Sequence, residues 1–313
     1  MFAWSRDSAW PAGPAILLPT ATAAPGVIDG HRVLDAHVHL QPWDMLKPSV
    51  RAVMERGRAD LADVLRFQRD RAAFEAFLEA EGVDACVAVN YVSPEVMGFP
   101  HEVNDWVGAY CAGSTRILPM GSVHPRFCPQ RPGDEVDRLV QKLGIRALKV
   151  HPAHQLLYPH AYQDDLPGLR DVYEAAESHQ VPVTIHTGTS VFPGARNRYT
   201  DPIYVDDVAV DFPDCQILLA HAGRPLWYDA AFFLARRHDN VHLELSGIPP
   251  KKLLEVLPRL ADISHKCVWG TDWPSPGVKS LRQNVMDFLA LPGLSDAAKG
   301  AILWENGARL FRV

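Results

Sequence analysis

Histidine and aspartate residues recur where short apolar segments of this sequence end. Residues 35–39 read Asp-Ala-His-Val-His, so His37 and His39 lie two positions apart. Alternate residues of a β-strand face the same way, and both imidazole rings could therefore bind one ion. Asp35 shares that face and would orient a ligand or brace the strand. Imidazole and carboxylate groups are common ligands of Zn²⁺, Mn²⁺ and Fe²⁺, so the pattern indicates metal chemistry.

Three further apolar segments close on residues of the same types, which are His186, His221 and Asp272. One such residue would be read as an ordinary buried polar group, but three of them together with the His-x-His pair favour a metal site. A catalytic metal needs an open coordination position for water or a substrate oxygen. Beside it, Asp272 could accept a proton from that water, and His221 could polarise a carbonyl group or carry a proton.

Eight strands are needed to bring these residues together. Segments rich in Val, Ile, Leu or Ala predict strands near residues 33–39, 84–90, 116–123, 145–151, 181–187, 215–221, 241–246 and 266–272. Between them, apolar residues three and four positions apart predict helices, as at Val136, Leu139, Val140 and Leu143. Strands that alternate with helices pair in parallel, and eight of them close into a barrel. We therefore predict an α/β protein, a single-domain (β/α)₈ TIM barrel with its active site at the C-terminal ends of the strands.

Length and composition fit one such domain. The chain has 313 residues and a net charge of −6, and it contains neither a basic block nor an apolar run of about 20 residues. Its five cysteines form no Cys-x-x-Cys pair and are odd in number, which fits free thiols in the reducing cytoplasm. We expect a cytoplasmic protein that binds a small molecule and neither nucleic acid nor a membrane. Whether it forms a homo-oligomer is left open.

The predicted barrel begins at residue 27. Residues 1–26 are rich in Ala and Pro and should form an arm on the barrel or on a neighbouring subunit. Only Arg6 is basic early in this segment and prolines interrupt its apolar stretch, so a secretion signal is the weaker alternative. Residues 27–313 contain no linker and should form one catalytic domain.

The motifs together resemble a known family. They are Asp35-Ala-His37-Val-His39, Ile185-His186-Thr-Gly, Leu219-Ala-His221-Ala-Gly, Gly270-Thr-Asp272-Trp-Pro and the closing Glu305-Asn306-Gly-Ala-Arg309-Leu310-Phe311. From about residue 27 to the end, the chain is similar to the amidohydrolase superfamily. The resemblance is greatest to its amidohydrolase-related branch, which includes aminocarboxymuconate-semialdehyde decarboxylase-like proteins and metal-dependent hydrolases. It implies four metal ligands and one catalytic histidine beside the metal: His37, His39, His186 and Asp272 as ligands, and His221 as the catalytic residue.

The same resemblance implies a reaction class but no substrate. The leading hypothesis is a metal-dependent hydrolase in which metal-activated water attacks a lactone, an amide or a related carbonyl of a small organic compound. The alternative is a lyase that decarboxylates an aromatic or unsaturated acid without oxidation. A third hypothesis, from a different class, is a metal-binding barrel without turnover, and an intact ligand set argues against it. The hydrolase and the lyase need the same ligands, so the motifs do not separate them.

Lys149 raises the question of how many metal ions bind. It shares one strand face with His151, and two-metal members of the superfamily bridge their ions with a carboxylated lysine in this strand. Otherwise a charged lysine would bind a substrate anion or stabilise the barrel. The amidohydrolase-related branch generally resembles a one-metal site. We therefore favour one divalent ion, with zinc ahead of manganese or iron, and keep the two-metal site as the alternative.

Residues that bind the substrate are predicted from chemistry and position: Lys149, His151, Arg196, Arg224 and Trp273. An arginine fork suits a carboxylate, although each arginine could also be a solvated loop charge. Trp273 could line the pocket or pack at its rim, and Tyr91 and His124 could line it after their strands. Other histidines, such as His154 and His160, are expected on loops or helix surfaces. Long segments that follow strands suit substrate-enclosing loops, namely residues 40–58, 91–100, 152–168 and 188–201.

Overall fold

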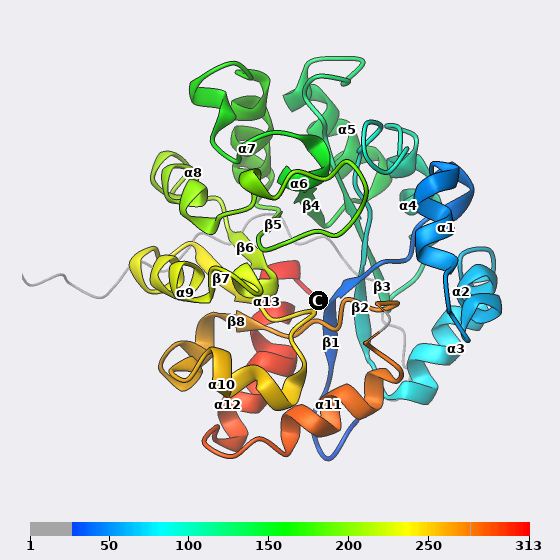
Figure 1. Ribbon diagram of the computed structural model, residues 1–313, viewed down its shortest axis with the longest axis vertical. Coiled ribbons are helices and arrows are strands. Elements are labelled where there is room, and N and C mark those ends of the chain that lie inside the picture. The colour runs from blue at the N-terminus through cyan, green and yellow to red at the C-terminus, as the bar shows by residue number, and fades with distance from the viewer. Residues whose placement is uncertain (1–26, 276) are drawn as a thin grey trace, which may run out of the picture.

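Eight parallel strands form the centre of the molecule, and each is hydrogen-bonded to the next in sequence order (Figure 1). They are β1 Leu34–Val38, β2 Ala85–Val89, β3 Ile117–Gly121, β4 Ala147–Val150, β5 Val183–His186, β6 Ile217–Ala220, β7 Val241–Glu244 and β8 Cys267–Val268. The computed structural model describes residues 27–275 and 277–313, so the arm predicted over residues 1–26 lies outside the described residues. Within them, the predicted (β/α)₈ barrel is confirmed.

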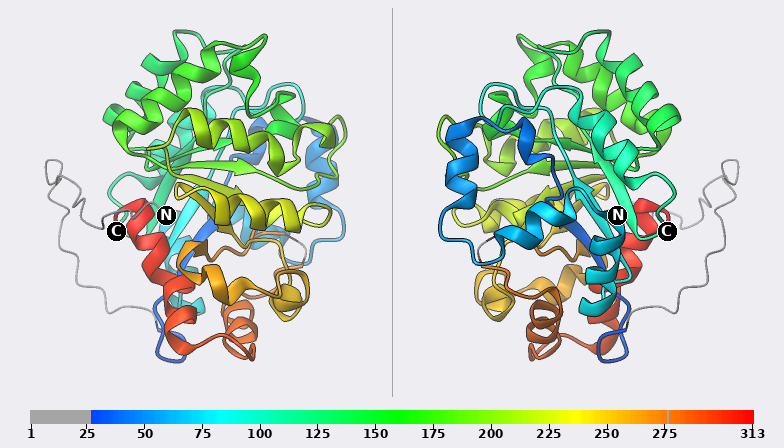
Figure 2. Two further views of the ribbon diagram at one scale, coloured as in Figure 1. Left: turned by 90° about the vertical axis from the view of Figure 1, so that its left-hand side faces the viewer. Right: turned by 90° about the vertical axis from the view of Figure 1, so that its right-hand side faces the viewer.

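Helices surround the strands, as Figure 1 and the two side views of Figure 2 show. They are α1 Pro48–Glu55, α2 Leu61–Phe67, α3 Arg71–Glu81, α4 Val103–Cys111, α5 Pro132–Leu143, α6 Pro152–Gln155, α7 Gly168–His179, α8 Val205–Asp211, α9 Tyr228–Arg237, α10 Leu253–Val256, α11 Leu281–Leu289, α12 Asp296–Gly300 and α13 Asn306–Phe311. The predicted apolar stripe of α5 is confirmed, because Val136 and Leu139 are fully buried. None of the helices in the described ranges combines the length and the apolar character that crossing a bilayer requires.

The seam between β8 and β1 is irregular, and it lies next to the predicted site. Strand β8 covers only two residues of the predicted segment 266–272, because the chain beyond Val268 leaves the regular ladder. Separate hydrogen bonds join this stretch to β1, such as the one from the Ala36 amide to the Trp269 carbonyl oxygen at 2.9 Å. The Asp35 carboxylate also accepts hydrogen bonds from the amide and the hydroxyl of Thr271, at 2.9 and 2.6 Å. Asp35 therefore braces the seam and lies beneath the residues that face the barrel mouth.

The C-terminal helix α13 packs against β1 and β8 and so joins the two ends of the described chain. Gly307 permits the close approach, since a Cβ atom there would lie 3.1 Å from the Leu34 Cδ2 atom. The amide group of Asn306 donates hydrogen bonds to the carbonyl oxygens of Ser264 and Cys267, both at 2.8 Å. The closing sequence motif thus has a structural function, which is to hold β8 in place.

Candidate metal centre and active site

His37 and His39 extend from the end of β1 to the barrel mouth, where Asp272 meets them. Asp272 Oδ1 lies 3.2 Å from His39 Nε2 and 3.9 Å from His37 Nε2. Two ligands of one tetrahedral zinc ion lie roughly 3.3 Å apart when each bond is about 2.0–2.1 Å long. His37 Nε2 is buried and has no hydrogen-bond partner among the described residues. The three side chains therefore fit a divalent metal ion, and they form a compact group of suitable ligand atoms.

Glu244, at the end of β7, fixes the protonation of His37. Its Oε2 atom lies 2.7 Å from His37 Nδ1. Burial raises the pKa of Glu244 to about 7, but both of its oxygens accept hydrogen bonds from Ser246, which favours the carboxylate. The carboxylate accepts from His37, so Nδ1 carries the proton and Nε2 keeps the lone pair that a metal requires. A second compact group consists of His37, Glu244 and His221, but its His37 nitrogen is already hydrogen-bonded and Glu244 is fully buried. We therefore place the ion on the Asp272 side of His37. Glu244 was not predicted from the sequence.

His221 follows β6 directly and has an uncommon backbone conformation, as does Asp272. Their φ angles are +64° and +68°, a region that costs energy for most residues and is populated mainly at functional sites and turns. His221 Nδ1 lies 2.9 Å from the Oγ atom and 3.2 Å from the carbonyl oxygen of Ser246. The Ser246 hydroxyl donates to Glu244 Oε2 at 2.8 Å and a carbonyl oxygen only accepts, so Nδ1 carries the proton and Nε2 is free to accept one. Burial holds the pKa of His221 well below its usual value, which keeps the ring neutral at pH 7.

His186, at the end of β5, reaches the same site but stands outside the compact group of three ligands. Its Nε2 atom is buried and has no partner in the described part of the chain. Its ring centroid lies 4.8 Å from that of His221 and 4.0 Å from that of His151, on which it stacks. The structure thus brings His186 to the site. That His186 is the fourth metal ligand remains a prediction.

Lys149 lies beneath the site. Its side chain is 1% exposed, and its Nζ atom has no hydrogen-bond partner within residues 27–275 and 277–313. Burial lowers the pKa of Lys149, although the carboxylates of Glu244 and Asp272 oppose the shift. Lys149 does not line the cavity described next, so the structure does not bring it into direct contact with the space for a substrate.

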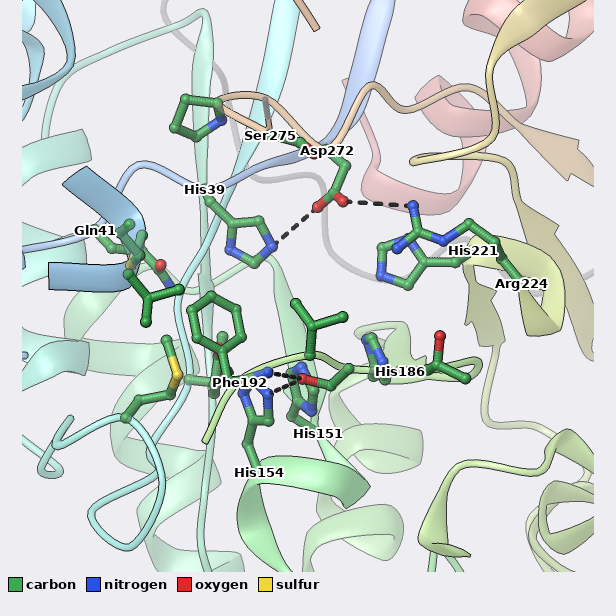
Figure 3. Close-up of a pocket in the computed structure, with 18 of the residues that line it drawn as sticks. His39, Gln41, His151, His154, His186, Phe192, His221, Arg224, Asp272 and Ser275 are labelled. Carbon is green, nitrogen blue, oxygen red and sulfur yellow. Dashed lines mark hydrogen bonds and ion pairs between the residues drawn. The ribbon is translucent and has the colours of Figure 1, made fainter. Parts of the chain in front are cut away.

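A cavity of about 310 Å³ opens onto these residues, a volume that suits a small organic molecule (Figure 3). Residues singled out from the sequence contribute much of its lining, namely His39, Tyr91, His151, His186, His221, Arg224 and Asp272. Residues of the long loops complete it, among them Arg56, Arg58, His154 and Ser190. The expectation that His154 lies on the surface was wrong. It is 1% exposed, because Tyr91 and Phe192 pack against its ring.

Three residues considered for the pocket lie elsewhere. Arg196 is exposed and His124 is buried, and neither lines the cavity. Trp273 is 5% exposed and packs against an aromatic cluster with centroid distances of 6.1, 5.7 and 5.5 Å to Phe67, Phe74 and Phe77. Trp273 is therefore directed toward α2 and α3, away from the mouth that Asp272 faces.

Replacing Trp273 with alanine should reduce the stability of the barrel. The substitution empties the centre of the aromatic cluster, and such losses cost about 3–5 kcal/mol. Urea unfolding of the metal-free protein measures the change. Phe233→Ala is the control, because Phe233 is 51% exposed and its loss should change the free energy of unfolding by less than about 1 kcal/mol. An unchanged stability together with weaker ligand binding would instead place Trp273 in the pocket wall.

Comparison with known proteins supports the barrel fold and also gives a family match. The family model described as amidohydrolase matches residues 34–313. None of the curated proteins compared with the chain is similar enough to count as a match. Among solved structures, an uncharacterized TIM-barrel protein from Bordetella bronchiseptica superposes with a TM-score of 0.67 at 20% identity, covering 90% of this chain and 98% of that one.

Two further solved structures carry names of enzymes. The 4-oxalomesaconate hydratase from Rhodopseudomonas palustris has a TM-score of 0.58 at 15% identity, with 90% of this chain and 95% of that one covered. The dihydroorotase from Saccharomyces cerevisiae, in complex with 5-fluoroorotic acid, has a TM-score of 0.56 at 13% identity, with 90% and 84% covered. At these identities the similarity shows the fold alone.

Proposed function

The chain belongs to the amidohydrolase family, and from this premise we propose that it hydrolyses a small organic carbonyl compound with the help of one divalent metal ion. The observation that carries the proposal is the group of His37, His39 and Asp272 at a cavity of about 310 Å³. We propose His186 as the fourth ligand. We propose zinc as the ion, because imidazoles combined with one carboxylate are a common zinc ligand set.

The residues around the ion divide the proton transfers between them. When bound, the ion would lower the pKa of a water molecule and polarise the substrate carbonyl. Burial acts to raise the pKa of Asp272, but the hydrogen bond with His39 and the interactions with His37 and Arg224 outweigh it and lower the pKa, so Asp272 stays ionised and can accept a proton from the attacking water. His221 has an unprotonated Nε2 and would carry that proton to the leaving oxygen or nitrogen atom.

A decarboxylase is the second candidate, and the charge of the cavity wall favours it. Arg56 lines the cavity, is exposed and takes part in no ion pair among the described residues. Arg224 lines the same space, with Nη1 4.0 Å from Asp272 Oδ2. Two arginines would attract an acid, and an acid is what a decarboxylase consumes.

Metal analysis combined with a substrate panel tests the proposal. We expect about one transition-metal ion per chain after purification without added metal, and two ions with a carboxylated Lys149 would instead establish the two-metal site. The panel should contain lactones, amides and carboxylated phenols, with detection of CO₂. Hydrolysis without CO₂ supports the hydrolase, and CO₂ release supports the lyase. A chain that takes up no metal and turns over no compound would contradict both.

A further inference from the structure

Three hydrogen-bonded side chains cross the part of the cavity wall that lies away from Asp272. The Tyr91 hydroxyl lies 3.0 Å from His154 Nδ1, and His154 Nε2 lies 2.7 Å from Ser190 Oγ. Tyr91 follows β2, His154 belongs to the short helix α6 after β4, and Ser190 follows β5. Three segments that follow different strands therefore meet here. Figure 3 shows His154 and Asp272 on opposite sides of the pocket. The proton transfers proposed above use none of the three.

Tyr91 determines the direction of these hydrogen bonds. The residue is 2% exposed, and within the described ranges its hydroxyl has one hydrogen-bond partner, His154 Nδ1. A buried hydroxyl group that donates to nothing carries a free-energy penalty, so Tyr91 donates to Nδ1. A neutral imidazole whose Nδ1 accepts must carry its proton on Nε2. His154 therefore donates from Nε2 to Ser190 Oγ.

Ser190 is then left with a hydroxyl hydrogen to donate. Its Oγ already accepts from His154, and it lies 3.4 Å from the amide nitrogen of Phe192, a second donor. Ser190 lines the cavity. Its backbone is held on both sides by Asn197, whose side-chain oxygen accepts from the Ser190 amide at 2.8 Å and whose side-chain nitrogen donates to the Ser190 carbonyl oxygen at 3.2 Å. The hydroxyl group is thus fixed in place with its hydrogen available to a ligand.

We infer that Ser190 donates a hydrogen bond to a carboxylate group of the substrate, and that His154 and Tyr91 hold it in this role. The inference rests on the proposed function and names a substrate class for it. Arg56, which has no ion pair among the described residues, and Arg224, which lies beside Asp272, line the same cavity and make it attractive to an anion. An anion is the acceptor to which a neutral hydroxyl binds most strongly.

The histidine rings connect this subsite with the metal group. His154 stacks on His151 with centroids 3.7 Å apart, and His151 stacks on His186 at 4.0 Å. Ser190 therefore lies at one end of a row of rings that reaches the proposed ligand His186 at the other. A substrate that spans this row would present its reacting carbonyl to Asp272 and its carboxylate to Ser190. The chemical class is a small carbonyl compound with a carboxylate on the side away from the reacting bond.

Binding of dicarboxylates to the full chain, with and without zinc, tests the inference. Titration calorimetry measures the affinity of the protein for succinate, glutarate and adipate. Each dicarboxylate is compared with the monocarboxylate in which a methyl group replaces one carboxylate. With zinc present to hold the first carboxylate, Ser190→Ala should weaken the best dicarboxylate about tenfold or more and leave its monocarboxylate partner within about threefold, as for loss of a hydrogen bond to a charged group. Ser190→Thr, which keeps a hydroxyl, should restore the affinity.

A control and a second readout separate this function from a merely structural one. Thr189→Val removes the hydroxyl of a neighbouring residue that also lines the cavity but is not part of the hydrogen-bonded group of Tyr91, His154 and Ser190. It should change dicarboxylate affinity less than about threefold. Nitrogen-15 spectra of the histidine side chains should show His154 protonated on Nε2. Protonation on Nδ1, an equal loss in both variants, or an intact protein that binds no dicarboxylate would overturn the inference. Neither measurement needs turnover, so an inactive or metal-free protein would count against the proposed function alone.

Discussion

The His39→Ala protein should lose its bound metal ion and nearly all of its activity. His39 Nε2 lies 3.2 Å from Asp272 Oδ1 and would supply one of the four ligands. Without the ion, water would not be acidified and the substrate carbonyl would not be polarised. Removing one hydrogen-bond donor that stabilises a transition state already costs about 10²–10³ in rate, and loss of the ion should cost at least as much. We expect turnover to fall by at least about 10³-fold. Elemental analysis and turnover, measured on the same preparation, check the result.

The barrel should stay folded in this variant, because the His39 side chain lies at the mouth and is 20% exposed. Zinc at 100 times its dissociation constant should stabilise the unmodified protein by about 2.7 kcal/mol, and the variant should lose this increase. His179→Ala is the matched control, since His179 lies on α7 outside the barrel and pairs with Asp137. Full metal occupancy in the His39 variant would remove His39 from the ligand set.

The strand ends made most of this site predictable. A parallel barrel delivers the C-terminal residue of every strand to the same mouth, so the residue types at the strand ends indicate which metal ligands and acid–base groups can meet there. His186, His221 and Asp272 meet around the cavity for this reason. Glu244 obeys the same rule, since its carboxylate ends the buried strand Val241–Glu244. It could therefore have been found from the sequence as a hydrogen-bond partner of a metal-binding histidine.

The loop residues could not be predicted in this way, because tertiary packing decides which of them face the cavity. Arg56, His154 and Ser190 all come from segments that were expected to enclose a substrate. Nothing in the local sequence shows that His154 is buried, since its environment comes from Tyr91 on a different loop. The position of Trp273 has the same origin, since the φ angle of +68° at Asp272 interrupts strand alternation and packing against Phe74 and Phe77 directs the ring away from the cavity.

Replacing His221 with asparagine should leave the metal ion bound and abolish most turnover. His221 would act on protons beside the ion, because four protein ligands and one water molecule would already give zinc five ligands, the most that a catalytic zinc usually takes. General acid–base assistance is typically worth about 10²–10⁴ in rate, so we expect a loss of that size. Metal content and turnover, measured on the substrate found with the panel, give the result.

Asparagine is the appropriate replacement because of the backbone at this position. His221 has a φ angle of +64°, which asparagine tolerates better than alanine does. The asparagine amide could also donate to the carbonyl oxygen of Ser246, as His221 Nδ1 does. The variant therefore removes the proton-accepting Nε2 with little change to the surrounding structure. Loss of metal along with activity would make His221 a ligand and favour a two-metal site, whereas metal retained with normal turnover would show that Asp272 carries the proton without it.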